Sequence, residues 1–219
     1  MKLKREKLAR IVNDLRYLLD QGYPRESAVD FVSNHYRLSL RERHLFARCV
    51  FSKQEAAEHR RKIVKAGTVR GKSLGIDGYN VIITLESIQT GKQVVRCDDG
   101  FLRDLRAIFG KYKASGATES AIEELLKVVA KAGPSEVTVF FDKQVSRSGE
   151  LAGKLRRGLR ELGLKGDSRA VGGVDFRLRG FDVVASSDRA VIKRAKAVWD
   201  ISAELLRQKK ADILDLKKI

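Results

Sequence analysis

The chain has 219 residues, which suffices for one or two domains, and 43% of them are hydrophobic, enough to form a substantial core. No stretch reaches the ~18–20 consecutive apolar residues of a membrane span, and the charged N-terminus lacks the apolar segment of a secretory signal, so we expect a cytoplasmic protein. The two cysteines lie far apart and there are only three histidines, which excludes a disulfide framework and argues against a zinc site.

The charge balance is strongly basic. The formal net charge is +17 and the isoelectric point is about 10.1. A surface this basic attracts polyanions, above all nucleic acid. Lysine-rich surfaces also occur in proteins that use charge only for solubility and ion pairing, so the charge indicates a class of partner and not yet a function.

The first 65 residues predict short helices and no strand. Leu8, Ile11 and Leu15 recur at helical spacing and define the first apolar stripe. A Gly-Tyr-Pro turn ends that helix, and a second helix is expected over 25–36. Two serines, each followed three positions later by a glutamate, predict capping boxes for a third helix and for a fourth that ends near Val64.

Short helices joined by tight turns resemble helix-turn-helix units, whose second helix can enter a nucleic-acid groove. The candidates for a reading face are Arg41, Arg43 and Arg48. The same side chains also fit the solvated side of a helical bundle, so both interpretations stay open.

The composition changes after this helical region. Two glycines and three basic residues fall within 65–72, which predicts a linker over 66–72 between a helical domain at 1–65 and a second domain at 73–219. Apolar runs predict strands in the second domain at 74–77, 94–97, 136–141, 168–171, 182–187 and 197–201. Amphipathic runs between them predict helices at 79–89, 99–113, 118–132, 149–162, 189–195 and 203–210. The alternation predicts an α/β fold with a Rossmann-like, mostly parallel sheet and helices on both faces.

Three of these strands end in aspartate. Asp77 follows the first run, Asp142 ends V-T-V-F-F-D, and Asp188 follows V-V-A-S-S. Ligands of parallel sheets gather at the carboxyl ends of the strands, so the three side chains should converge. Oxygen ligands of this kind hold Mg²⁺ or Mn²⁺, which can promote phosphodiester hydrolysis. The alternative is that Asp77 and Asp188 are helix caps, a role that aspartate serves well, but the repeated pattern favours the site.

Neighbouring polar residues extend the candidate site. Asn80, Ser186 and Ser187 are suited to orient a carboxylate, a water molecule or a phosphate. The cations expected to hold phosphates are Lys143, Arg147 and Arg189. In Cys97-Asp98-Asp99-Gly100, Asp99 is a candidate cap for the predicted 99–113 helix, and Asp98 is either a structural residue or a further metal ligand.

These motifs resemble a known family. D-G-Y-N after an apolar strand, F-F-D and a late S-S-D-R are similar to motifs of the PIN/NYN-type nuclease fold, over about residues 73–200. The whole chain resembles the mostly archaeal proteins grouped as domain of unknown function 434 with a PIN-like C-terminal domain. The resemblance implies that Asp77, Asp142 and Asp188 are metal ligands, with Asp175 as the acidic residue ahead of the last motif. The interval between Asp175 and Asp188 is shorter than in the family.

Two functions follow as hypotheses. The first is a Mg²⁺- or Mn²⁺-dependent nuclease that acts on RNA in preference to DNA, as a monomer or a homodimer and away from membranes. The second is a non-catalytic nucleic-acid-binding or regulatory protein that uses the same fold as a scaffold. Other α/β sites fit less well: Asp77-Gly78-Tyr79 lacks the D-x-D of haloacid-dehalogenase-type phosphatases, and no G-x-G-x-x-G is present.

Overall fold

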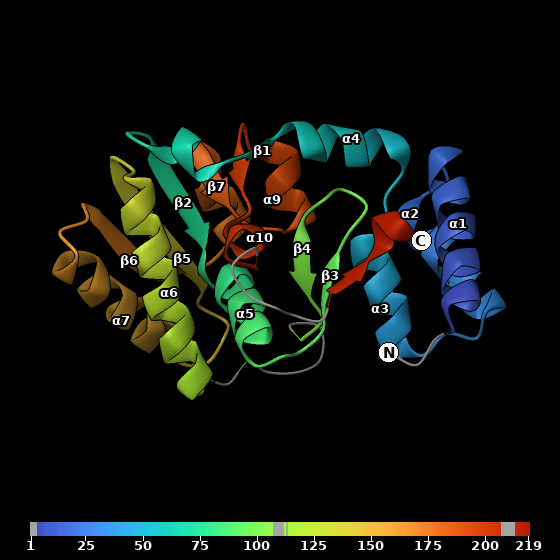
Figure 1. Cartoon of the computed structure of the whole chain (residues 1–219), viewed down its shortest axis with the longest axis horizontal. Helices are drawn as coiled ribbons and strands as arrows, with labels where there is room; N and C mark the ends of the chain where they lie inside the picture. The colour runs from blue at the N-terminus through green and yellow to red at the C-terminus, as the bar shows by residue number, and fades with distance from the viewer. Residues whose placement is uncertain (1–3, 107–111, 113, 207–212) are drawn as a thin grey trace.

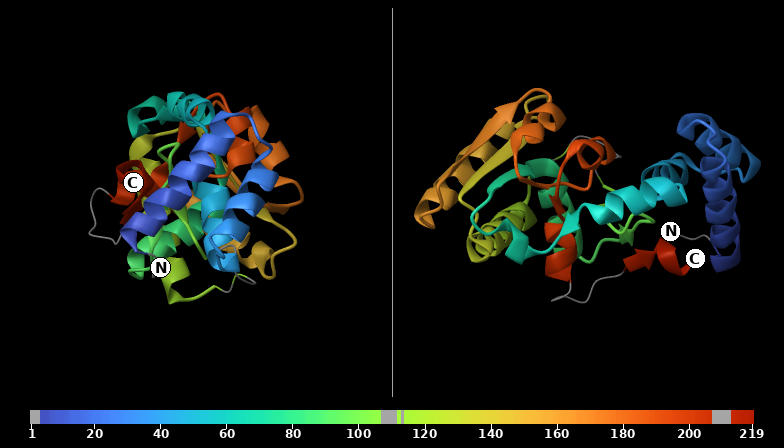
Figure 2. Two further views of the ribbon diagram at one scale, coloured as in Figure 1. Left: turned by 90° about the vertical axis from the view of Figure 1, so that its right-hand side faces the viewer. Right: turned by 90° about the horizontal axis from the view of Figure 1, so that it is seen from above.

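The computed structural model describes residues 4–106, 112, 114–206 and 213–219. The helical N-terminal region consists of α1 (Arg5–Asp20), α2 (Arg25–His35), α3 (Leu40–Cys49) and α4 (Lys53–Arg61). Ser39 forms the predicted capping box with Glu42, and Ser52 caps α4. Figures 1 and 2 show α4 extending from the bundle of α1–α3 to the rest of the molecule.

The main sheet is six-stranded and all its pairings are parallel, as the sequence predicted. In spatial order its strands are β1 (Ile63–Val64), β8 (Val198–Trp199), β7 (Val183–Ala185), β2 (Ser73–Asp77), β5 (Glu136–Asp142) and β6 (Gly166–Val171).

The order of the strands creates a switch point. The chain goes from β2 outward to β5 and β6, and then returns to β7 and β8 on the other side of β2. The carboxyl ends of β2 and β7 therefore border the crevice in which open α/β sheets bind their ligands.

Helices cover both faces of this sheet. Along β5, Val139 and Phe141 enter one core while Phe140 enters the other, as the alternation of strand side chains requires. The first core is closed by α5 (Gly78–Gln89), α6 (Gly116–Ala132), α7 (Ser148–Glu161) and α10 (Ile201–Leu206). The second is closed by α8 (Val174–Arg177), η2 (Leu178–Gly180) and α9 (Arg189–Arg194). Among the helices of the described ranges, none is both long and apolar enough to span a bilayer.

A second sheet lies between the helical bundle and the main sheet (Figure 1). It contains the antiparallel pair β3 (Val94–Arg96) and β4 (Leu102–Asp104), with β9 (Ile213–Asp215) parallel to β3. Val95 of this sheet, together with Cys97 after β3 and Leu216 after β9, is fully buried in the same core as α1–α3. Leu216 lies in η3 (Leu216–Lys218), so the C-terminal segment completes the core of the N-terminal helices.

Several predicted elements are wrong. The 99–113 region contains the strand β4 in place of helix, because Gly100 adopts φ +88° in a tight turn and Cys97 N donates to Phe101 O to close a hairpin. The expected helix residues 107–111 and 113 lie outside the described residues, as do 207–210 of the predicted 203–210 helix. The first 65 residues do contain a strand, because α4 ends at Arg61 and β1 pairs with β8.

The predicted linker is partly structured. Residues 66–72 include the 3-10 helix η1 (Ala66–Val69), in which Val69 is fully buried. Gly71 N donates to Gly133 O, at the C-terminal end of α6. The connection between the two regions is therefore packed against the α/β core.

Candidate functional site

The first and last sequence motifs meet at the switch point. Asp77 ends β2 and caps α5, accepting a hydrogen bond from Asn80 N at 3.3 Å. Ser186 Oγ donates to Asp77 Oδ2 at 3.1 Å. Ser187 donates to Asn80 Oδ1 from its backbone N at 2.7 Å and from its hydroxyl at 3.0 Å. D-G-Y-N and S-S-D-R thus form one hydrogen-bonded unit across β2 and β7.

The other two strand-end aspartates also serve local backbone roles. Asp188 caps α9, where its Oδ1 accepts from Ala190 N at 2.8 Å and from Val191 N at 3.2 Å. Asp142 Oδ1 accepts from Gln144 N at 2.9 Å. The cap interpretation of Asp77 and Asp188 is therefore correct, and it leaves a role at a site open because each cap bond engages Oδ1.

The electrostatics connect the three carboxylates. The pKa of Asp77 is raised to about 6 in all: burial raises it most, the bonds from Asn80 and Ser186 lower it, and the negative charges of Asp188 and Asp142 raise it. Asp188 and Asp142 are therefore each close enough to Asp77 to repel its ionised carboxylate. A cation between them would relieve this repulsion.

The donor atoms suit a hard divalent cation. Carboxylate, hydroxyl and amide oxygens are the ligands that Mg²⁺ and Mn²⁺ prefer. Within the described residues, however, no three His, Cys, Asp or Glu side chains are grouped closely enough to form a complete metal site. The arrangement therefore fits an ion held by one or two carboxylates and water, which is the usual coordination of Mg²⁺, and not a cage of three carboxylates.

Asp98 and Asp175 are held elsewhere. Asp98 lies at the tip of the β3–β4 hairpin and is turned toward the helical bundle, where Arg16 Nη2 donates to its Oδ1 at 2.6 Å and Phe51 N to its Oδ2 at 3.1 Å. Asp175 is half-exposed on α8 and pairs with Arg194 at 2.8 Å. We therefore leave both out of the proposed metal site.

The predicted cations differ in their surroundings. Lys143 and Arg147 are exposed in the loop after β5; Lys143 directly follows Asp142, and Arg147 pairs with Glu150 at 3.2 Å. Arg189 forms an ion pair with Glu55 of α4. On the helical bundle, Arg41 is exposed, Arg43 pairs with Asp30 at 2.6 Å, and Arg48 donates to Asp104 O at 3.2 Å. Arg43 and Arg48 thus have structural partners within the chain.

A buried ionic cluster beside the site was not predicted. Arg103 donates to both oxygens of Asp99 at 2.7 Å and from Nε to Ser187 O at 2.8 Å. Burial alone would raise the pKa of Asp99, but Arg103 and His59 lower it to about 2. Because Asp99 is then ionised, His59 donates to it from Nδ1, at 2.9 Å. Nothing in a single sequence marks an arginine as buried.

Asp200 is a further strand-end aspartate that the sequence reading missed. It follows β8 and accepts from Leu102 N at 2.8 Å and from Ala203 N at 2.9 Å. Burial raises its pKa. The signal was present, since Asp200 follows an apolar run as Asp77 does, but the predicted strand at 197–201 included it.

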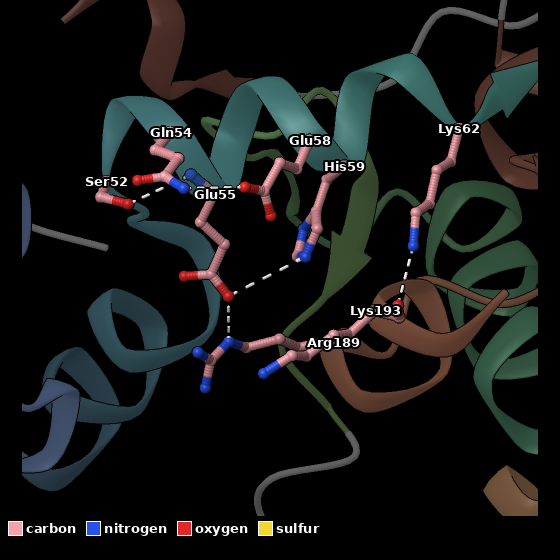
Figure 3. Close-up of a pocket in the computed structure, with 8 residues that line it drawn as sticks. All are labelled: Ser52, Gln54, Glu55, Glu58, His59, Lys62, Arg189 and Lys193. Atoms are coloured by element: carbon pink, nitrogen blue, oxygen red, sulfur yellow. Dashed lines mark hydrogen bonds and ion pairs between the residues drawn. The ribbon is translucent and has the colours of Figure 1, made fainter. Parts of the chain in front are cut away.

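A pocket of about 210 Å³ lies between α4 and α9, and His59 of the buried ionic cluster is among its lining residues (Figure 3). Glu55 points across the pocket to Arg189, while Lys62 reaches the backbone carbonyls of Ile192 and Lys193 at 2.9 and 2.8 Å. The walls carry both signs of charge: Glu55, Glu58 and Lys62 come from α4 and its end, and Arg189 and Lys193 come from α9 on the other side. The pocket is therefore a polar junction of α4 with the site loop.

The chain belongs to the family described as "Domain of unknown function (DUF5616)", which matches residues 66–204. Residues 7–62 match the family described as "Protein of unknown function (DUF434)". The chain is 37% identical over 195 residues to "Uncharacterized protein MJ0935" of Methanocaldococcus jannaschii, covering 88% of this chain and 93% of that protein. No solved structure matches the chain. The expected relationship to the 434 family and to an archaeal protein is thus confirmed, and the PIN-like relationship of the second domain stays a prediction.

Proposed function

We propose that the protein is a metal-dependent nuclease that hydrolyses phosphodiester bonds in RNA. The observation that carries the proposal is the hydrogen-bonded unit of Asp77, Asn80, Ser186 and Ser187 at the switch point of a parallel sheet. Two further aspartates lie near enough to raise the pKa of Asp77. Strongly perturbed carboxylates at such a crevice are typical of functional sites.

Each residue has a role that follows from its contacts. Asp77, with Asp142 or Asp188, would hold Mg²⁺ or Mn²⁺. The bound ion supplies an activated water molecule and neutralises charge on the phosphate. Ser186 orients the Asp77 carboxylate through its hydroxyl, and Asn80 holds Ser187 and hence the loop before Asp188. Lys143 and Arg147, which are exposed in the loop that follows Asp142, would contact the phosphate backbone.

The net charge of +17 favours a polyanionic substrate over a small molecule. We propose RNA before DNA on the resemblance to PIN/NYN-type nucleases. The same charge predicts that substrate binding weakens steeply as salt rises, because each neutralised phosphate releases counterions.

The first test is cleavage of labelled RNA and DNA, single- and double-stranded, with Mn²⁺, Mg²⁺ or EDTA. We expect metal-dependent cleavage that Asp77→Asn lowers by roughly 100-fold or more, because the metal's charge contributes several kcal/mol to the transition state. Binding in EDTA should remain within a few-fold. Asp182→Asn is the matched control: Asp182 joins β7 to β2 at the opposite edge, where it accepts from Ser73 N at 3.0 Å.

A second candidate is a nucleic-acid-binding protein without catalysis. It is favoured by the lack of a three-carboxylate group within the described part of the chain. Salt-dependent binding with no cleavage under any metal condition would support this second function and contradict the nuclease. Equal cleavage by wild type and Asp77→Asn would place the activity at another site.

A further inference from the structure

Helix α4 is joined to the site loop, defined here as Ser186–Arg189, by one direct ion pair and by one chain of hydrogen bonds. The first contact crosses the pocket of Figure 3, where Glu55 of α4 forms an ion pair with Arg189. Glu55 is held in place by a second partner, because Arg25 Nη2 donates to its Oε2 at 2.9 Å. The pKa of Glu55 is lowered despite its burial, because Arg189 and Arg25 both donate to it.

The second contact passes through the buried cluster. His59 of α4 donates to Asp99, Asp99 is bonded through both oxygens to Arg103, and Arg103 Nε donates to Ser187 O at 2.8 Å. The exposed fractions of the Asp99 and Arg103 side chains are 0% and 2%. A charge-assisted bidentate pair that is shielded from water fixes geometry more strictly than a surface ion pair does.

These contacts end on a backbone group that matters for the site. The Ser187 carbonyl is held by Arg103, and the N–H of the same residue is held by Asn80 of α5. Ser186 and Asp188 flank Ser187, so fixing this residue also fixes the hydroxyl that orients Asp77 and the backbone from which Asp188 extends. Arg103 reaches the loop from the β3–β4 hairpin, whose tip the helical bundle holds through Arg16 and Asp98.

We infer that α4 of the N-terminal helical region is a positioning element for the proposed active site. The positioning residues are Glu55 of α4, which holds Arg189, and Arg103 of β4, which α4 reaches through His59 and Asp99 and which holds Ser187. Neither is among the proposed metal or phosphate ligands. This inference assigns a role to the helical region other than nucleic-acid recognition. The expected effect of α4 on cleavage rests on the proposed function, whereas its expected effect on the geometry of the site loop does not.

The test compares Arg103→Lys and Glu55→Gln with Lys62→Gln. Lys62 also joins α4 to α9, but it binds carbonyls at the far end of α9, away from the site loop. Backbone amide hydrogen exchange reports on the loop directly. We expect exchange of Ser187 and Asp188 to become roughly 10-fold faster in the first two variants and to stay unchanged in the control, because only the first two lose a bond to the loop.

Cleavage provides the second readout. Loss of an outer-shell positioning contact commonly costs 10- to 100-fold in activity. We expect kcat to fall by roughly 10-fold in Arg103→Lys while KM stays within about 2-fold, since the residue does not touch substrate. Lysine keeps the charge beside Asp99 but cannot reach both Asp99 and Ser187.

Folding is checked in parallel by the fluorescence of Trp199. The double variant Asp99→Asn/Arg103→Gln removes both charges together, which avoids leaving one buried charge unpaired, and it should show the same faster exchange. Exchange in all these variants equal to that of Lys62→Gln would overturn the inference. If the wild type cleaves nothing, the proposed function fails, yet the exchange comparison still decides whether α4 positions the loop.

Discussion

At the scale of single residues, Asp77 combines a structural and a chemical role. Its Oδ1 caps α5, which stabilises the helix start, while Ser186 holds Oδ2 near two other carboxylates. The capping bond favours the ionised form, but burial and the neighbouring acids oppose it more strongly and raise the pKa to about 6. A bound cation would therefore stabilise the ionised carboxylate of Asp77, which its surroundings disfavour.

This raised pKa predicts a pH dependence of stability. The folded-state pKa of about 6 lies above the unfolded value of about 4, so the folded protein binds the Asp77 proton more tightly than the unfolded chain does. This proton binding stabilises the fold below about pH 4, and the stabilisation is lost as pH rises from about 4 through 6. Asparagine does not ionise, so Asp77→Asn does not show this loss of stability. We expect the variant to gain about 2–3 kcal/mol of unfolding free energy relative to wild type between pH 4 and pH 7.5 in EDTA.

Urea titrations followed by Trp199 fluorescence would measure this difference. Mg²⁺ or Mn²⁺ at pH 7.5 should stabilise the wild type and leave Asp77→Asn unaffected, because a ligand of the folded state raises stability by mass action. A stability difference that stays constant across this pH range would contradict the assigned pKa.

Single residues also mark the limit of what the sequence can predict about the site. Asp77, Asp142 and Asp188 could be found because each ends an apolar run. The role of Arg103 could not, because its partner Ser187 is 84 positions away and either residue alone looks ordinary. The surroundings of Asp98 could not be predicted for the same reason: its partner Arg16 is 82 positions away.

At the scale of elements, the start of α5 depends on close packing with β5. A Cβ atom added to Gly78, the first residue of α5, would lie 2.5 Å from the ring of Phe141, whose side chain is fully buried. We expect Gly78→Ala to destabilise the fold by about 1–3 kcal/mol through overpacking. The measurement is chemical denaturation, with Phe141→Leu added to make room for the new methyl group.

Gly116→Ala is the matched control, because Gly116 is likewise the first residue of a helix and an added Cβ would meet nothing within 4 Å. That change should be neutral or stabilising by less than about 1 kcal/mol. The double variant Gly78→Ala/Phe141→Leu should lose less unfolding free energy than the two single variants lose together. Strict additivity would show that the two residues do not compete for the same space.

The elements that sequence could predict are those with one clear pattern of burial. β2, β5 and β7 are covered on both faces and therefore read as continuous apolar runs. β1 and β9 have 2 and 3 residues, too few to show any pattern. β4 was mistaken for helix because Phe101, Leu102 and Leu105 are all buried, but in three different cores, which imitates helical spacing.

At the scale of the whole molecule, the N-terminal helical region and the α/β region are joined by a common hydrophobic core. Val95 of the second sheet and its neighbours Cys97 and Leu216 are buried among α1–α3. The helices therefore cannot unfold without exposing apolar surface of the α/β region. This interlocking predicts one cooperative unfolding transition for the described structure, in contrast to two separable domains.

Leu45→Ala tests this prediction. Leu45 is buried in the helical bundle, and its truncation should cost about 2–5 kcal/mol. The chain has one tryptophan, Trp199, which lies in β8 of the main sheet and so reports on the other region. If the molecule unfolds as a unit, Leu45→Ala lowers the urea midpoint of Trp199 fluorescence as much as that of far-UV circular dichroism.

Leu155→Ala in α7 is the control in the other region, and it should lower the two urea midpoints by the same amount. A tryptophan transition that stays at the wild-type midpoint in Leu45→Ala would show that the helical bundle unfolds alone.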